Sequence, residues 1–125
     1  MAVDEVYVKE LLRVKGSFLY HRENQELEFK EQFNFAGLGD YFRDFAAFAN
    51  NRGGHIIFGV QDSPRVPCGL KEHNLNQLNK IDPERISGFL LEIFSSDIRW
   101  EQSTIEHDGK YFGAFRIYEA QLSQL

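Results

Sequence analysis

The sequence predicts an α+β domain in which helices pack against one mixed β-sheet. Segments with apolar residues at helical spacing alternate along the chain with short apolar segments typical of strands. Near the end, the pair Asp108-Gly109 separates two alternating segments and predicts a C-terminal β-hairpin over residues 99–118. The length of 125 residues and the hydrophobic content of 42% suit a single domain, which we place at residues 1–125.

The first element is expected to be an amphipathic helix over residues 3–15. Val8, Leu11 and Leu12 fall on one face of such a helix, whereas the intervening residues are mostly charged. Gly16 follows as the expected stop.

A strand is expected over residues 26–31. Leu27 and Phe29 alternate there with Glu28 and Lys30, so the two apolar side chains point to one face and the two charged ones to the other.

A loop at Gly37 and Gly39 precedes the second helix, for which Asp40 is the expected N-cap. Residues 50–54 are expected to end this helix, because glycine adopts the left-handed conformation that helix ends favour. The helix is expected to bury a stripe of side chains at helical spacing: Phe42, Phe45, Ala46 and Ala49. We expect this stripe to cover the sheet, so Phe45 should be buried.

The strand expected over residues 55–60 is apolar on both faces, which favours a central place in the sheet. A turn-rich loop at residues 61–69 and a short helix at residues 74–79 follow. Asp82 and Pro83 then begin a longer helix, which Ser95 and Ser96 should end. Its inner face is expected to carry Ile86, Phe89, Leu90 and Ile93.

Charge and composition exclude several classes of protein. The net charge of −5 argues against a strong non-specific DNA binder, although it permits a local basic patch. No apolar run is long enough for a membrane span, and residues 1–10 lack the pattern of a signal peptide. Cys68 is the single cysteine, so a disulfide within the chain and a cysteine-based zinc site are excluded. A reducing, cytoplasmic setting is expected.

A series of short motifs stands in one order between residues 23 and 70, and together they are more specific than any one alone. The motifs are Glu23, Glu28-Phe29-Lys30, Ala47-Phe48-Ala49-Asn50, Gly53-Gly54-His55-Ile56-Ile57-Phe58-Gly59-Val60, Asp62 and Gly69. The series resembles the Schlafen AlbA-like (AlbA_2) family, whose members share a Glu-Phe-Lys strand, an Ala-Phe-Ala-Asn helix end, a Gly-Gly turn and a Gly-Val strand. Asn51 departs from the family, in which this position is often threonine.

The resemblance implies a domain that binds DNA or RNA as a targeting or regulatory module, for example in transcription regulation. Bacterial members stand in front of ATPase-like or winged-helix regions, and animal members are parts of Schlafen proteins. The resemblance therefore predicts a downstream partner domain and a place at the N-terminal part of a longer protein. A homodimer stays open.

The resemblance also implies a candidate catalytic site. In Schlafen members that are RNA endonucleases, two glutamates five residues apart and an acidic residue after the Gly-Val strand form a metal-dependent site. Glu23 and Glu28 have that spacing here, and Asp62 follows the strand, with Gln61 where an acidic residue would also fit. These carboxylates are the candidate ligands for Mg²⁺ or Mn²⁺. The alternatives are a solvated strand face for Glu28 and an ordinary turn for Asp62.

Basic residues flank the motifs and are the candidate phosphate contacts: Arg22, Lys30, Arg52 and Arg65. Gly53 and Gly54 have two interpretations, a tight helix-to-strand turn or a close approach of the backbone to a phosphate, and we favour the turn.

Three functions stay open. A nucleic-acid-binding domain without enzymatic activity is favoured, the first alternative is a metal-dependent endoribonuclease, and the second is a protein-interaction or dimerisation module, which the acidic balance permits.

Overall fold

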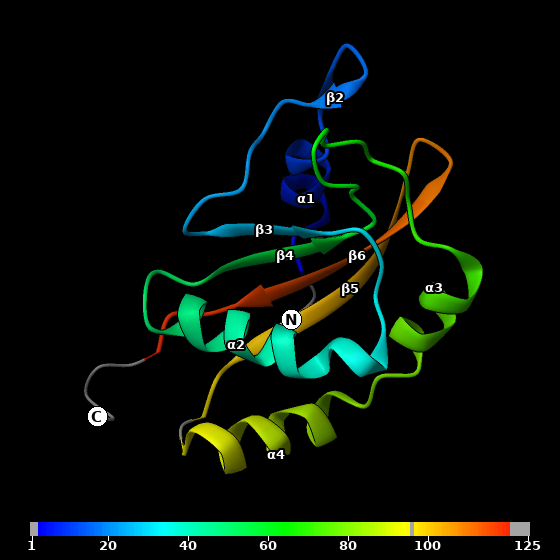
Figure 1. The fold of residues 1–125 in the computed structure, drawn as a ribbon. Coiled ribbons are helices and arrows are strands. Elements are labelled where there is room, and N and C mark those ends of the chain that lie inside the picture. Colours follow the sequence, from blue (N-terminus) through cyan, green and yellow to red (C-terminus); the bar gives the residue numbers. More distant parts are fainter. Residues whose placement is uncertain (1–2, 96, 121–125) are drawn as a thin grey trace.

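Four strands form a mixed sheet in the order β3-β4-β6-β5 in the computed structural model, which describes residues 3–95 and 97–120 (Figure 1). The parallel pair β3 and β4 places Glu28 opposite Ile56, and the other neighbouring pairs are antiparallel. The strands are β3 (Leu27–Lys30), β4 (Gly54–Phe58), β5 (Trp100–His107) and β6 (Lys110–Ile117).

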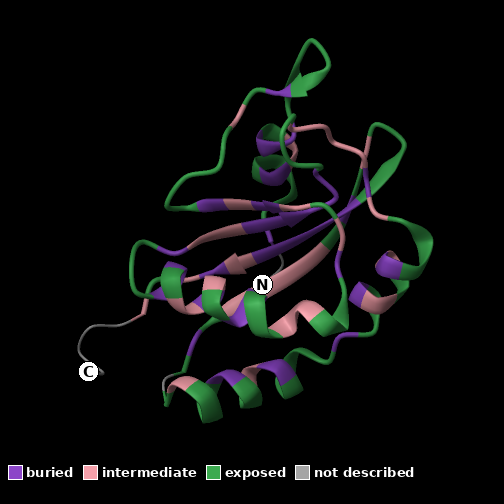
Figure 2. Ribbon diagram, viewed as in Figure 1, coloured by how far each residue is buried: buried purple, intermediate pink, exposed green. Residues whose placement is uncertain are grey.

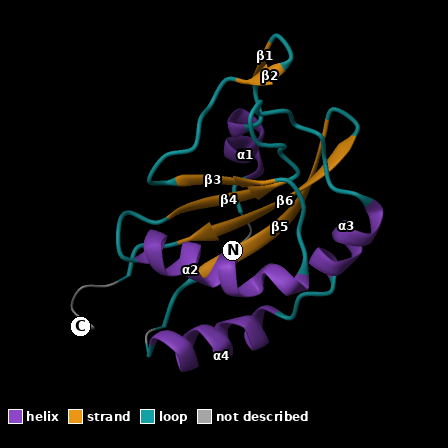
Figure 3. Ribbon diagram, in the orientation of Figure 1, coloured by secondary structure: helices purple, strands orange, loops and turns teal. Residues whose placement is uncertain are grey.

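Helices cover both faces of this sheet (Figure 3). One face carries the larger core, in which side chains of α2, α3 and α4 pack on Ile56, Phe58 and Phe115. The opposite face is covered by α1, which packs on Leu27 and Ile57. The helices are α1 (Glu5–Leu11), α2 (Leu38–Ala49), α3 (Glu72–Asn79) and α4 (Pro83–Phe94), and a 3-10 turn, η1 (Phe35–Gly37), precedes α2.

The predicted sheet and its covering helix are confirmed. Leu27 and Phe29 lie in the same sheet as β4, and β4 is a central strand whose residues Ile56–Phe58 are fully buried. Phe45 of α2 is 1% exposed and packs in the larger core, which confirms the predicted packing of this helix on the sheet. Figure 2 shows buried stretches along α2. The C-terminal hairpin turns at Asp108 and Gly109, both with positive φ as a two-residue turn of this kind requires.

The helix predicted over residues 3–15 is too long. It ends at Leu11, and Val14–Lys15 (β1) instead pairs with Phe18–Leu19 (β2) in a small hairpin. Gly16, with φ +70°, is the turn of that hairpin rather than a helix stop. The sequence pattern could not distinguish a helix end from a hairpin turn at this position, because glycine favours both.

The start of α2 and the inner face of α4 also differ from the prediction. Asp40 lies in the first turn of α2, whose N-cap is Gly37. In α4, Ile86 and Leu90 are buried, but Phe89 and Ile93 are 38% and 58% exposed. The helix touches the core along one line of residues four apart, so side chains off that line face solvent. The helix begins at Asp82 and Pro83 as predicted, with Asp82 as its N-cap, which accepts a hydrogen bond from the Glu84 N–H group. Of the two residues predicted to end α4, Ser95 is its C-cap, and Ser96 lies outside the described residues.

None of the helices in the described part of the chain has the length and apolar character of a membrane span.

Candidate functional site

Charged side chains gather where the edge strand β3 meets α2. Glu28 and Lys30 pair with Ile56 and Phe58, so they point to the face of the sheet that α2 covers. The ammonium group of Lys30 lies 3.1 Å from Asp44 Oδ2 on α2 and 3.6 Å from Glu28 Oε1. The face for which solvation was the alternative interpretation is therefore a partly buried ion-pair cluster.

Glu23 joins this cluster from the segment before β3. Its Oε2 atom accepts a hydrogen bond of 2.8 Å from the Phe29 N–H group, which points away from β4. Glu23 thus satisfies a backbone donor on an edge strand, where unpaired donors otherwise invite other chains. This bond holds the Glu23 carboxylate beside Glu28.

The pKa of Glu28 is raised from its ordinary value of 4.5 to about 7. Burial is the main cause, the negative charge of Glu23 adds to it, and Lys30 opposes it. Lys30 itself has a raised pKa, because its contacts with Asp44 outweigh the effect of burial. Glu28 can therefore gain or lose a proton near neutral pH.

Glu28→Gln is expected to change how stability depends on pH. Because the pKa of Glu28 is near 7 in the folded state and 4.5 in the unfolded state, the folded state binds its proton more tightly. The contribution of this proton to the stability of the fold is complete below pH 4.5 and lost as pH rises through 7. His55 acts in the opposite direction between pH 4 and 6.5, because its folded pKa is lowered to about 4. The stability of the wild type should therefore reflect both groups, whereas the stability of Glu28→Gln should show only the rise with pH that His55 causes.

Melting temperatures at pH 5, 6, 7 and 8 test this expectation. Relative to wild type, Glu28→Gln should gain stability towards pH 8, on the order of 1 kcal/mol, because solvent screens a side chain that remains 33% exposed. Glu31→Gln removes an exposed carboxylate next to the strand and should follow the wild type. Parallel curves for wild type and Glu28→Gln would show that Glu28 does not titrate in this range.

Asp62 does not join Glu23 and Glu28. It lies exposed in the loop after β4, where its Oδ1 atom accepts a hydrogen bond from the Ser63 hydroxyl. Across residues 3–95 and 97–120, no three His, Cys, Asp or Glu side chains are arranged to hold a metal ion. The Lys30 ammonium also stands among the carboxylates of the cluster. The donor set therefore does not fit the metal site that the resemblance implied.

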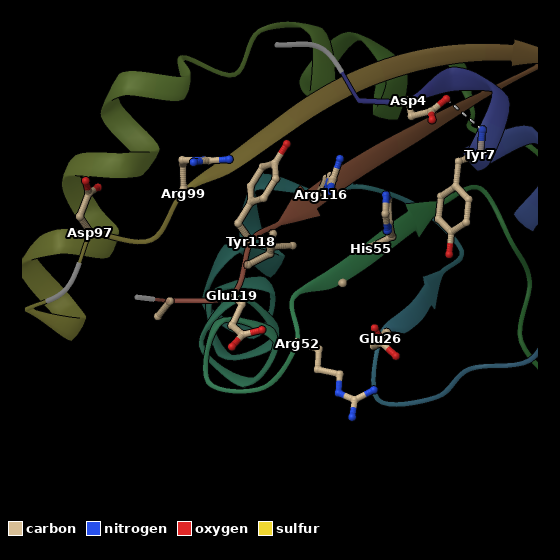
Figure 4. Close-up of a pocket in the computed structure, with 13 residues that line it drawn as sticks. Asp4, Tyr7, Glu26, Arg52, His55, Asp97, Arg99, Arg116, Tyr118 and Glu119 are labelled. Carbon is tan, nitrogen blue, oxygen red and sulfur yellow. Dashed lines mark hydrogen bonds between the residues drawn. The ribbon is translucent and has the colours of Figure 1, made fainter. Parts of the chain in front are cut away.

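An open cleft of about 650 Å³ lies on the face of the sheet that α1 covers, beside the N-terminal end of this helix (Figure 4). Arg116 on β6 and His55 on β4 are paired across the two strands and share this face with the α1 core. Arg99 reaches the cleft from the segment before β5, and Arg52 from the loop between α2 and β4. We call this site, with Arg52, Arg99, Arg116, His55 and Tyr118 in its wall, the arginine cleft.

Tyr118 holds two of the arginines. The Cζ atoms of Arg99 and Arg116 lie 4.1 and 4.4 Å from the centre of its ring, and in Figure 4 they flank the ring on either side. The Tyr118 hydroxyl donates a hydrogen bond of 2.5 Å to Glu101, which fixes the ring. Cation–π contacts of this kind hold a guanidinium while its N–H donors stay available to another group.

The positive charge of the cleft at neutral pH comes from its arginines and not from His55. Burial, aided by the charge of Arg116, lowers the pKa of His55 to about 4, so its imidazole is neutral at pH 7. Four carboxylates also line the cleft: Asp4, Glu26, Asp97 and Glu119. The site is therefore mixed in charge, with paired guanidinium groups at one end.

The predicted basic residues lie in different settings. Arg52 lines the cleft and Arg22 is exposed before β3, so both are available to a ligand. Arg65 donates hydrogen bonds of 3.0 Å to the carbonyl groups of Leu19 and His21 and so ties its loop to the small hairpin. Lys30 is held in the ion-pair cluster.

Sequence reasoning missed Arg99 and Arg116. The predicted hairpin could have indicated that Arg99 and Tyr118 are neighbours, because they stand at its two ends. In the structure, the Tyr118 N–H group donates a hydrogen bond to the carbonyl oxygen of Arg99, which precedes β5 by one residue. Strand alternation then places Arg116 and Tyr118 on one face.

Gly53 and Gly54 serve the turn. Gly53 has φ +79°, and an added Cβ atom would lie 2.6 Å from the carbonyl oxygen of Ile117. A Cβ atom on Gly54 would lie 2.6 Å from the Phe48 ring and 2.8 Å from the carbonyl oxygen of Glu26. The close approach at these glycines is made by the protein's own chain, which supports the interpretation as a turn.

Comparison with known proteins gives one family and several relatives. The model of the family "Schlafen, AlbA_2" matches residues 23–124. An uncharacterized ATP-binding protein of Ureaplasma parvum serovar 3 is 39% identical over 99 residues, which are 78% of this chain and 27% of that protein. The chain thus spans about a quarter of the length of this relative.

Two solved structures share the fold. The N-terminal domain of an ATP-dependent DNA helicase RecG-related protein from Nitrosomonas europaea has a TM-score of 0.50 at 22% identity, covering 82% of this chain and 69% of that one. The DIP2311 protein of Corynebacterium diphtheriae has a TM-score of 0.53 at 18% identity, covering 95% of this chain and 25% of that one. At these identities the likeness concerns the fold alone.

Proposed function

The chain belongs to the Schlafen AlbA_2 family, and from this premise we propose that it is a nucleic-acid-binding domain whose contact surface is the arginine cleft. One observation carries the proposal: Arg52, Arg99 and Arg116 line a single open cleft in a chain whose net charge is −5. Guanidinium groups bind phosphate through paired N–H donors, and arginine is one of the side chains that contact nucleic-acid backbones.

The arrangement of the guanidinium groups supports this choice of surface. The contacts of Arg99 and Arg116 with the single ring of Tyr118 keep the two guanidinium groups close together, so both can contact the same strand. Two side chains that are already ordered lose less conformational entropy on binding than flexible ones. Because four carboxylates also line the cleft, the proposal depends on the position of the paired Arg99 and Arg116 and not on the net charge of the site.

We further propose that the domain directs an ATPase-like partner region to nucleic acid. The support is the relative from Ureaplasma parvum, which is described as ATP-binding and is matched by this chain over 27% of its length. DNA and RNA are both candidate ligands.

The double variant Arg99→Ala, Arg116→Ala is expected to bind nucleic acid about 10- to 100-fold more weakly than wild type, because two charge-assisted contacts are lost. The salt dependence should also flatten by about 0.7–0.9 in slope for each lost phosphate contact. Fluorescence anisotropy with labelled 12-nucleotide probes, single-stranded and duplex, at several salt concentrations measures both quantities.

The control for this experiment is Arg43→Ala, Arg85→Ala. It removes the same charge from α2 and α4, in the layer on the other face of the sheet, and should leave affinity and slope near wild type. Equal losses in both double variants would mean that only net charge matters. A wild type that binds no probe at low salt would overturn the proposal and favour the protein-interaction module.

The second candidate function, a metal-dependent endoribonuclease, is disfavoured by the residues present, because only Glu23 and Glu28 of the three expected carboxylates lie together and Lys30 stands among them. The candidate third carboxylate, Asp62, stands apart from this pair. Incubation of tRNA with wild type and with Glu28→Gln, each with Mn²⁺, tests it. Equal background products from both proteins would exclude this candidate.

A further inference from the structure

We propose that the arginine cleft takes an unpaired nucleic-acid strand, which continues past Tyr7 to the β1–β2 hairpin. This inference rests on the proposed function and names its class of ligand. The cleft has a neighbour of about 180 Å³, and the two hollows share Tyr7 and Glu26 in their walls. The remaining residues around the second hollow are Glu10, Leu11, His21, Asn24 and Leu27.

Exposed aromatic side chains mark the proposed path. Tyr7, between the two hollows, is 48% exposed, and its ring lies 5.1 Å from the His55 ring. At the far end, Tyr20 is 50% exposed and packs edge-on against His21, which lines the second hollow. The Cζ atom of Arg13 lies 4.2 Å from the centre of the Tyr20 ring, and the Nε atom of Arg13 is ion-paired with Glu10 Oε2 at 3.0 Å.

Exposed tyrosine rings that follow a cleft lined by arginines suit an unpaired strand better than a duplex. A base offers its face for stacking only when it is unpaired, and aromatic platforms with arginine are typical of single-strand sites. The Tyr118 ring is flanked by two guanidinium groups, whereas the Tyr20 ring contacts one, that of Arg13. We therefore assign Tyr7 and Tyr20 to bases.

The charges along the path support the same choice. Glu26 lines both hollows, and Asp4 lines the cleft beside Tyr7. The phosphates of a duplex laid along the path would meet these carboxylates. An unpaired strand can instead turn its bases, with their N–H donors, towards the carboxylates and its phosphates towards the arginines.

Binding of a 12-nucleotide strand and of the same sequence as a duplex tests the inference, with DNA and RNA versions of each. We expect the unpaired strand to bind about tenfold or more tightly than the duplex. Tyr7→Ala and Tyr20→Ala should each weaken single-strand binding about 5- to 100-fold without changing the salt slope, because stacking rather than a phosphate contact is lost.

Matched variants separate stacking from folding. Tyr7→Phe and Tyr20→Phe keep the rings and should bind like wild type, and Tyr111→Ala removes a 45% exposed ring of β6 that lines neither hollow. Melting curves confirm that each variant is folded. A preference for DNA or RNA among the unpaired strands identifies the sugar that is read and supports the inference.

Failure of this inference differs from failure of the proposed function. Equal affinities for strand and duplex, with neutral Tyr7→Ala and Tyr20→Ala but a weakened Arg99→Ala, Arg116→Ala variant, would overturn the single-strand inference and leave the proposed function standing. Absence of binding to every probe would overturn the proposed function itself.

Discussion

Phe115→Ala is expected to lower the free energy of unfolding by about 3–5 kcal/mol, the usual cost of removing a large aromatic side chain from a core. Phe115 is 2% exposed and stands at the centre of the larger core. Its ring centre lies 4.9 to 6.0 Å from those of four others: Phe33, Phe45, Phe58 and Trp100. The substitution would remove contacts from all four at once, and the β-sheet behind the ring cannot close the cavity.

Urea denaturation measures the effect, with Trp100 as the probe because its ring lies 5.2 Å from that of Phe115. Phe89→Ala is the matched control, since this phenylalanine of α4 is 38% exposed and should cost far less. A loss below about 1 kcal/mol for Phe115→Ala would contradict the central position of this ring in the core.

Gly53→Ala is expected to lower the free energy of unfolding by about 1–3 kcal/mol from backbone strain alone, and the steric overlap should add to this loss. Gly53 adopts φ +79°, and an added Cβ atom would lie 2.6 Å from the carbonyl oxygen of Ile117 at the end of β6. Relief of the overlap requires a shift of backbone, because no flexible side chain is involved. Since Arg52 precedes this residue, the same substitution should also weaken binding at the arginine cleft.

Gly88→Ala is the control for this experiment. Gly88 lies inside α4 without a positive φ, and its added Cβ atom would meet nothing within 4 Å. Alanine at this position should therefore stabilise the protein by about 0.5–1 kcal/mol. Thermal melting of both variants measures the pair, and a Gly53→Ala variant as stable as wild type would show that the turn can relax.

The sequence was sufficient where a local pattern decides the structure. Alternation placed Leu27 and Phe29 on the opposite face from Glu28 and Lys30, and the Asp108-Gly109 pair located the hairpin. Helical spacing identified the buried Phe42 and Phe45 of α2. Each of these features depends on residues within a few positions of one another, so the pattern contains the information.

The candidate site was only partly visible in the sequence. The motif around β3 drew attention to Glu23 and Glu28, and the structure brings these two together. The third partner in space is Asp44, from a helix and at no motif position, whereas Asp62 stands elsewhere. Partners contributed by another element depend on how that element packs, which spacing along the chain does not report.

By itself the sequence determined the fold class, the order of most elements and the family, because periodicity, turn chemistry and motif order are local properties. The tertiary structure alone decided that the helix at the start stops at Leu11, that Phe89 of α4 faces solvent and that Arg99 and Arg116 meet on Tyr118. The physical reason is common to all three: each depends on which distant surface a segment packs against, and the free energy of that packing outweighs local preference.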